Sequence, residues 1–203
     1  MPTAPLIVKS IILINILVFL GWFLAMSNPY YLEWMIENFL VSWDALLKGR
    51  PWVLLTSAFS HNSFFHLFIN MYVLLGFGTV LTRMMGATTF LNFYLIAGIA
   101  GSFMHALVSL IFLDTPELPA LGASGAIAGI ILLFSLTFPK ERLLFLGIIP
   151  IRAGWAALMV IGIDVWGLIE QTKGGGLPIG HGAHLGGALM GIVWFLAFRP
   201  KKI

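Results

Sequence analysis

Long stretches without a charged residue are the feature that most constrains how this chain can fold. The stretches cover residues 10–32, 51–82, 84–113, 118–139, 143–163 (broken only by Arg152) and 174–198. Each is close to or above the roughly 20 residues that a helix needs to cross a bilayer. The sequence therefore predicts an all-α membrane protein, a bundle of six transmembrane helices that forms a single domain over residues 1–203.

The composition excludes several other classes of protein. Charged residues make up 9% of the 203 residues and hydrophobic residues 60%, whereas a soluble domain carries about 25% charged residues. The chain has no cysteine, which excludes disulfides, thiol catalysis and cysteine-based metal sites. The net charge of +3 is not gathered into a basic cluster, so we expect a lipid bilayer and no nucleic acid as partner.

The positive charges predict the orientation in the membrane. One side of a six-helix arrangement receives Lys9, Arg83, Lys140, Arg142, Arg152, Arg199, Lys201 and Lys202, and the other receives only Lys48, Arg50 and Lys173. By the positive-inside rule both termini are cytoplasmic. Because no targeting peptide or seventh span is evident, we expect a bacterial inner (plasma) membrane.

The loop after the first expected helix, residues 27–50, mixes aromatic and acidic side chains. These are Tyr30, Tyr31, Trp34, Phe39 and Trp43, interleaved with Glu33, Glu37 and Asp44. Such a mixture at helical spacing favours segments that lie in the membrane interface. An aromatic belt is the simpler interpretation, and contact with a substrate is the alternative.

Ser124 is the first candidate for chemistry. Gly122, Ala123 and Gly125 surround it, and such small neighbours leave its hydroxyl accessible to a ligand. A serine in this setting is either a packing residue or a nucleophile. A nucleophile also needs a base within hydrogen-bond reach and donors for the oxyanion.

His184 is the candidate base. Gly125 and Gly129 follow Ser124, and Gly187 and Gly191 follow His184. Two helices that carry such faces can pack very closely, which would place the imidazole beside the hydroxyl near the outer surface. No acidic residue is evident at that depth, so we expect a Ser-His dyad. Asp164, near the outer end of the fifth expected helix, has either a functional role or only a contact with water or a neighbouring helix.

His66 and Asn70 are candidate oxyanion donors. They are four residues apart and so share one face of a helix, and the backbone amide of Ser124 can assist them. His61 belongs to another face of that helix or to the loop before it. We expect His105 to be a buried structural residue. His181 lies in the last loop or begins the last helix. There is no HExxH motif and the spacing of His61 and His66 is wrong for two ligands one turn apart, so we expect no metal.

Three motifs together resemble the rhomboid family of intramembrane serine proteases, of the bacterial six-helix type. They are His61-Asn-Ser-Phe-Phe-His66-Leu-Phe-Ile-Asn70, Gly122-Ala123-Ser124-Gly125, and Ala183-His184-Leu-Gly-Gly187-Ala-Leu-Met-Gly191. The resemblance implies a serine endopeptidase that cleaves transmembrane protein substrates in or next to their membrane segments, with no metal and no organic cofactor.

The resemblance also implies the roles of individual residues. Ser124 would be the nucleophile and His184 the general base, and His66, Asn70 and the Ser124 amide would bind the oxyanion. The supporting residues would be His61, Gly122, Gly125 and Gly187. The active site would face the outer side, and the loop of residues 27–50 would be a membrane-embedded hairpin.

The chain departs from the family pattern at two positions. Val53 follows Trp52 where many members have arginine, and Ala128 stands where some members carry a tyrosine that stacks on the catalytic histidine. We therefore expect a loop and an imidazole that are held more loosely or by other contacts. The alternatives are an inactive relative that binds transmembrane segments, and a small transporter, which would require an internal repeat that the sequence lacks.

Overall fold

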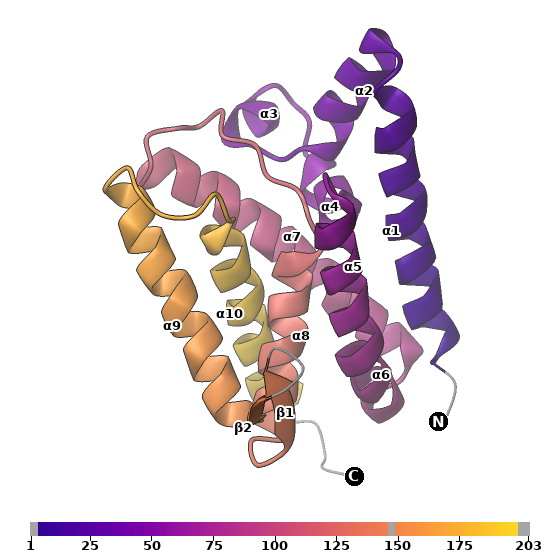
Figure 1. The fold of residues 1–203 in the computed structure, drawn as a ribbon, viewed down its shortest axis with the longest axis vertical. Helices are drawn as coiled ribbons and strands as arrows, with labels where there is room; N and C mark the ends of the chain where they lie inside the picture. The colour runs from indigo at the N-terminus through magenta and orange to yellow at the C-terminus, as the bar shows by residue number, and fades with distance from the viewer. Residues whose placement is uncertain (1–3, 146–148, 199–203) are drawn as a thin grey trace.

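The computed structural model describes residues 4–145 and 149–198, and these are mostly helical (Figure 1). The elements in chain order are α1 (Leu6–Ala25), α2 (Pro29–Phe39), α3 (Trp43–Leu47), α4 (Val53–Thr56), the 3₁₀ turn η1 (Ser57–Phe59), α5 (Phe64–Val73), the π-helical turn η2 (Leu74–Gly78), α6 (Thr79–Met85), α7 (Ala87–Ile111), α8 (Ser124–Thr137), β1 (Arg142–Phe145), β2 (Ile149–Arg152), α9 (Ala153–Thr172) and α10 (His181–Phe198).

In the part of the chain that the structure describes, five helical segments are long and apolar enough to cross a membrane. They are α1, the continuous segment Phe64–Met85, α7, α9 and α10. The prediction of six such helices holds only in part, because α8 has 14 residues and is therefore about 21 Å long. Residues 118–123 form a loop ahead of it, in which Ala120 pairs with Val41 through a β-bridge. The chain is an integral multi-pass membrane protein.

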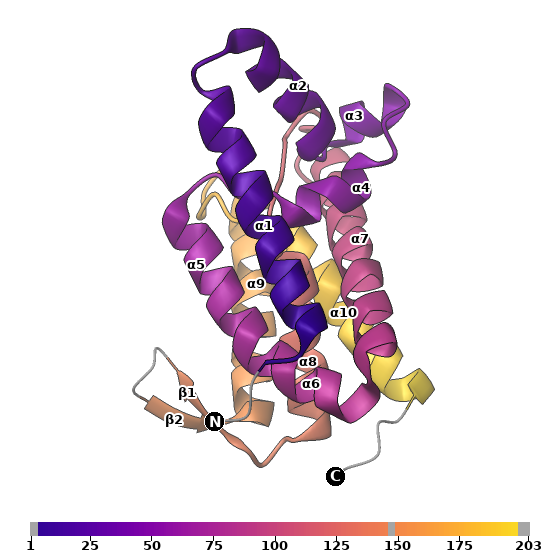
Figure 2. The same cartoon turned by 90° about the vertical axis from the view of Figure 1, so that its right-hand side faces the viewer.

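α8 lies in the middle of the bundle, among α5, α7, α9 and α10 (Figures 1 and 2). The ends of the described chain and the β1–β2 hairpin lie at one end of the molecule, and α2, α3 and the loop before α10 lie at the other. This arrangement agrees with the expectation that both termini are on the same side of the membrane.

Glycines bring α8 and α10 into backbone contact. A Cβ added at Gly187 would overlap the carbonyl oxygen of Gly125, and one at Gly191 would lie 2.7 Å from the carbonyl oxygen of Gly129. Real Cβ atoms do not approach so closely, so other residues at these positions would force the helices apart. The predicted packing of the two glycine faces is confirmed.

The start of the fifth expected helix is wrong. Instead of the helix expected over about residues 144–169, the chain forms an antiparallel hairpin in which Arg142 pairs with Arg152, and α9 begins at Ala153. Pro150 explains this, because proline lacks the N–H that a helix interior needs and restricts the preceding residue to an extended backbone. α9 ends at Thr172, a little beyond the expected end of this helix.

The loop of residues 27–50 is built mainly from helices. Asn28 caps α2 by accepting from the N–H groups of Tyr30 and Tyr31, which is a favoured N-cap arrangement. Arg50 forms an ion pair with Glu37, and the Trp52 indole donates to Asn38 at 3.0 Å. These contacts to α2 hold the segment, although Val53 stands after Trp52 where many family members have arginine. The insertion of this segment into the membrane stays a prediction.

Candidate active site

Ser124 is the first residue of α8, and the loop before it holds it in place. Gly122 has φ of +131°, a backbone conformation that favours glycine, and its N–H donates to the carbonyl of Ser57 at 2.9 Å. A Cβ at Gly122 would lie 2.8 Å from Cε1 of His66. Glycine at this position therefore lets the His66 ring approach the backbone just before Ser124.

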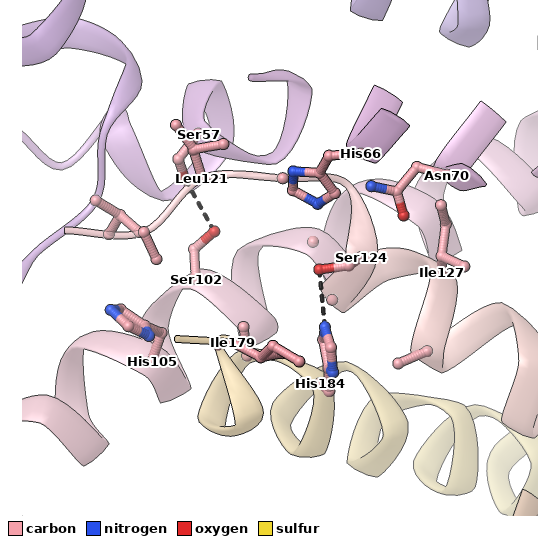
Figure 3. Close-up of a pocket in the computed structure, with 18 of the residues that line it drawn as sticks. Ser57, His66, Asn70, Ser102, His105, Leu121, Ser124, Ile127, Ile179 and His184 are labelled. Carbon is pink, nitrogen blue, oxygen red and sulfur yellow. Dashed lines mark hydrogen bonds between the residues drawn. The ribbon is translucent and has the colours of Figure 1, made fainter. Parts of the chain in front are cut away.

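His184 lies in the first turn of α10 and faces Ser124 (Figure 3). Its Nε2 is 2.9 Å from the Ser124 Oγ. The two residues are 60 positions apart in the chain and meet because the glycine faces that follow them are in contact. This is the juxtaposition of hydroxyl and imidazole that the two glycine faces predict.

Asp164 adds a carboxylate to this pair. Its Oδ1 lies 2.9 Å from Nδ1 of His184, and the residue is only 5% exposed. The expectation that no acid lies at this depth is therefore wrong, whereas the Ser-His dyad as the catalytic unit stays a prediction. The three side chains lie in a row in space: Ser124 is within hydrogen-bond distance of His184, and His184 is within hydrogen-bond distance of Asp164.

The wrong start of the fifth expected helix explains why Asp164, for which the sequence left a functional and a passive role open, was not assigned to the site. Because α9 begins at Ala153 and ends at Thr172, Asp164 lies near the middle of the helix and not at its outer end. The Gly154 N–H bonds to the carbonyl of Pro139, so α9 starts close to where α8 ends. Asp164 is eleven residues along α9 and Ser124 thirteen residues from the end of α8, which gives them similar depths. A charged residue within a membrane span was the available signal.

His181 contacts the same carboxylate. It is the first residue of α10, is 2% exposed, and its Nδ1 lies 2.7 Å from Oδ1 of Asp164. Because His181 and His184 are three residues apart, both face α9. With N–H groups at both Nδ1 atoms, Asp164 accepts two hydrogen bonds and the Nε2 of His184 remains an acceptor for the Ser124 hydroxyl.

His66 and Asn70 face the same cavity as Ser124 and His184 (Figure 3). The cavity has a volume of about 820 Å³. The two residues lie one turn apart on α5, as their spacing predicts. Both side chains carry N–H groups that can donate into the cavity.

His61 precedes α5 and supports Asn70. Its Nε2 lies 3.0 Å from Nδ2 of Asn70, and its ring makes an edge contact with His66 at a centroid distance of 4.8 Å. Since Asn70 Nδ2 can only donate, His61 Nε2 accepts and the ring is neutral. Burial, followed by the neighbouring His66, lowers the pKa of His61 from 6.5 to about 3, which agrees with this hydrogen bond.

The far wall of the cavity contains further polar residues, of which the sequence analysis considered only His105. Ser57 and Ser102 share a hydrogen bond of 3.0 Å. His105, expected to be structural, is buried and donates from Nε2 to the carbonyl of Leu118 at 3.2 Å. The recurrence of small and polar residues along α7 was the available signal, but it also fits plain helix packing.

Asp164, His181 and His184 are also the described residues that could hold a metal ion. Their ligand atoms all lie within 4.8 Å of one another. Two imidazoles and a carboxylate form a ligand set that zinc uses in proteins, so the expectation of no metal remains a prediction.

Comparison with known proteins shows what the sequence of this chain is similar to. A family model described as a Rhomboid domain matches residues 48–201. Over 97% of its length the chain is 35% identical to the presenilin-associated rhomboid-like protein, mitochondrial, of Rattus norvegicus, of which it covers 49%. It is 32% identical to RHOMBOID-like protein 12, mitochondrial, of Arabidopsis thaliana (97% of this chain, 59% of the relative) and to Rhomboid protein 1, mitochondrial, of Saccharomyces cerevisiae (97% and 55%). The chain thus spans about half the length of these relatives.

Proposed function

We propose that this chain, which belongs to the rhomboid family, is a serine endopeptidase that hydrolyses peptide bonds in or next to the transmembrane segments of other membrane proteins. The observation that carries the proposal is the 2.9 Å contact between Ser124 Oγ and His184 Nε2 at the wall of a cavity. A hydroxyl paired with a neutral imidazole is the arrangement that activates a serine nucleophile.

The first step is attack of Ser124 Oγ on the carbonyl carbon of the substrate, while the hydroxyl proton passes to Nε2 of His184. Asp164 accepts from Nδ1 of His184. It thereby holds the imidazole in the tautomer that can take the proton and stabilises the imidazolium that forms. We propose this carboxylate as a third member of the catalytic group, in place of the expected dyad.

The negative charge on the former carbonyl oxygen is stabilised by N–H groups of His66, Asn70 and the Ser124 backbone. His61, hydrogen-bonded to Asn70, fixes the orientation of that amide. His184 then returns its proton to the leaving amine, and water from the cavity hydrolyses the acyl-enzyme. None of these steps uses a metal or an organic cofactor.

The substrates we propose are proteins with transmembrane helices, within the same bilayer. Ser124 and His184 line the cavity and lie in the first turns of α8 and α10. Both helices start away from the end of the bundle that holds the termini (Figure 1), so cytoplasmic termini would place the active site toward the outer face. The expectation of a bacterial inner membrane receives no support from the relatives compared above, whose names include the word mitochondrial.

Cleavage of a transmembrane reporter by the purified full chain in detergent tests the proposal. We expect Ser124→Ala and His184→Ala each to abolish cleavage, because members of a catalytic group fail together. Ser135→Ala is the matched control, since Ser135 is a buried serine of the same helix and does not line the cavity. Cleavage retained in Ser124→Ala would overturn the proposal. Labelling of Ser124 by a fluorophosphonate separates an active enzyme from an inactive relative.

A further inference from the structure

Three atoms that can bind a metal converge between α9 and α10. Asp164 Oδ1 lies 2.7 Å from Nδ1 of His181 and 2.9 Å from Nδ1 of His184. Ligands of a tetrahedral zinc ion, each at 2.0–2.2 Å from the metal, lie about 3.3 Å apart. To hold an ion, the two Oδ1–Nδ1 contacts would have to lengthen by about half an ångström. The three ligand atoms, which all lie within 4.8 Å of one another, would also have to gather around the ion.

The charge of the cluster favours a cation. In the part of the chain that the structure describes, the two imidazoles are the partners recorded for the buried Asp164 carboxylate, and no lysine or arginine contacts it. With both imidazoles neutral the cluster has a net charge of −1 in apolar surroundings. Buried charges are normally paired or coordinate metals.

Access is available from the cavity side. His184 lines the cavity and its side chain is 21% exposed, whereas those of His181 and Asp164 are 3% and 7% exposed. An ion could thus arrive at His184 first and complete its coordination with the two buried ligands. A fourth position remains for water from the cavity.

We propose that Asp164, His181 and His184 form a binding site for a divalent transition metal, zinc being the best match, and that an ion bound there switches the enzyme off. The ligand set of two imidazoles and one carboxylate, with one open position, is one that zinc adopts in proteins. The inhibitory part rests on the proposed protease function, whereas the binding site itself does not.

The physical reason for inhibition is the tautomer of His184. A metal on Nδ1 occupies the lone pair that remains when the Nδ1 proton leaves, and the neutral ring then carries its proton on Nε2. Nε2–H donates to Ser124 and can no longer accept its proton. His181 changes tautomer in the same way, so binding needs no net release of protons and no redox step.

Binding is tested first, with zinc chloride and cobalt(II) chloride, on the purified full chain carrying Ser124→Ala. We expect one ion per chain in calorimetry and a tetrahedral cobalt spectrum. Adding His181→Asn should weaken binding at least tenfold, since even losing an outer partner of a metal ligand costs that much. His105→Asn, a histidine elsewhere in the cavity wall, should leave binding unchanged.

If His181→Asn perturbs folding, the cobalt spectrum of the chain with all three ligands still decides, because an octahedral spectrum or none would overturn the site. Unchanged affinity in a folded His181→Asn variant would also overturn it and point to other ligands, such as His61 and His66.

Inhibition is tested by cleavage of the transmembrane reporter. Zinc should lower kcat while leaving KM nearly unchanged, and EDTA should restore the rate. The His181→Asn variant should be at least tenfold less sensitive to inhibition by zinc, when its rate is compared with its own metal-free rate. A chain that binds zinc at this site and cleaves at the same rate would overturn the inhibitory role. A chain inactive in EDTA would contradict the proposed function, and the cobalt spectrum would still test the site.

Discussion

Gly167 and His181 fit one another across the contact between α9 and α10. A Cβ at Gly167 would overlap the imidazole of His181, so the ring reaches Asp164 only because residue 167 has no side chain. Asp164 and Gly167 are three residues apart on one face of α9. The contact between His181 and the carboxylate therefore depends on a glycine that takes no part in the chemistry.

Replacing Gly167 by alanine should displace His181 and loosen Asp164. We expect kcat to fall by about tenfold to a hundredfold, because small misplacements of catalytic groups have effects of this size. Reporter cleavage measures this. Gly162→Ala is the matched control, as a Cβ there would have no neighbour within 4 Å. Equal activity of the two variants would contradict a positioning role for His181.

Asp164→Asn should lower kcat more strongly. The amide cannot stabilise an imidazolium and favours the wrong tautomer of His184, and in serine proteases such a change costs up to about 10⁴-fold. Glu170→Gln removes an acid of the same helix that forms an ion pair with the exposed Lys173, and should have little effect. A Ser-His dyad that works without the acid would instead leave Asp164→Asn nearly as active as the control.

Gly187→Ala should destabilise the bundle. The new Cβ would overlap the Gly125 carbonyl, and forcing extra atoms into a tight contact costs typically about 1–3 kcal/mol. Thermal unfolding in detergent measures the change. Gly76→Ala, where a Cβ would be free of contacts, should not lower the melting temperature. A similar loss in both variants would show that close contact of α8 and α10 is not what the glycine provides.

His61 should make the folded state sensitive to acid. Its pKa is about 3 in the folded protein, against an ordinary value of 6.5. Between about pH 6.5 and pH 3, His61 binds a proton in the unfolded chain but not in the folded protein. The free energy of unfolding therefore falls as the pH is lowered through that window. His61→Gln, which can still hydrogen-bond Asn70, should reduce the slope of unfolding free energy against pH. Parallel pH profiles for the two proteins would mean that His61 titrates normally.

The features that were predictable from the sequence are those encoded within short segments. Uncharged stretches reveal membrane helices because lipid cannot solvate charge. The glycine faces of Gly125 and Gly187 reveal which two helices meet, since only small residues permit backbone contact. These local signals were enough to place Ser124 beside His184.

The tertiary structure decided how deep the side chains of separate helices lie relative to one another, although Pro150 was a local signal for the late start of α9. Hydropathy does not separate the start of α9 from the apolar hairpin strand before it, and Pro150 moved that start to Ala153. The shift carries Asp164 from the expected outer end to the level of Ser124. Likewise α10 begins below the end of α9 (Figure 1), a difference set by the course of residues 173–180. Depth is a relation between separate helices, so no single segment of the sequence contains it.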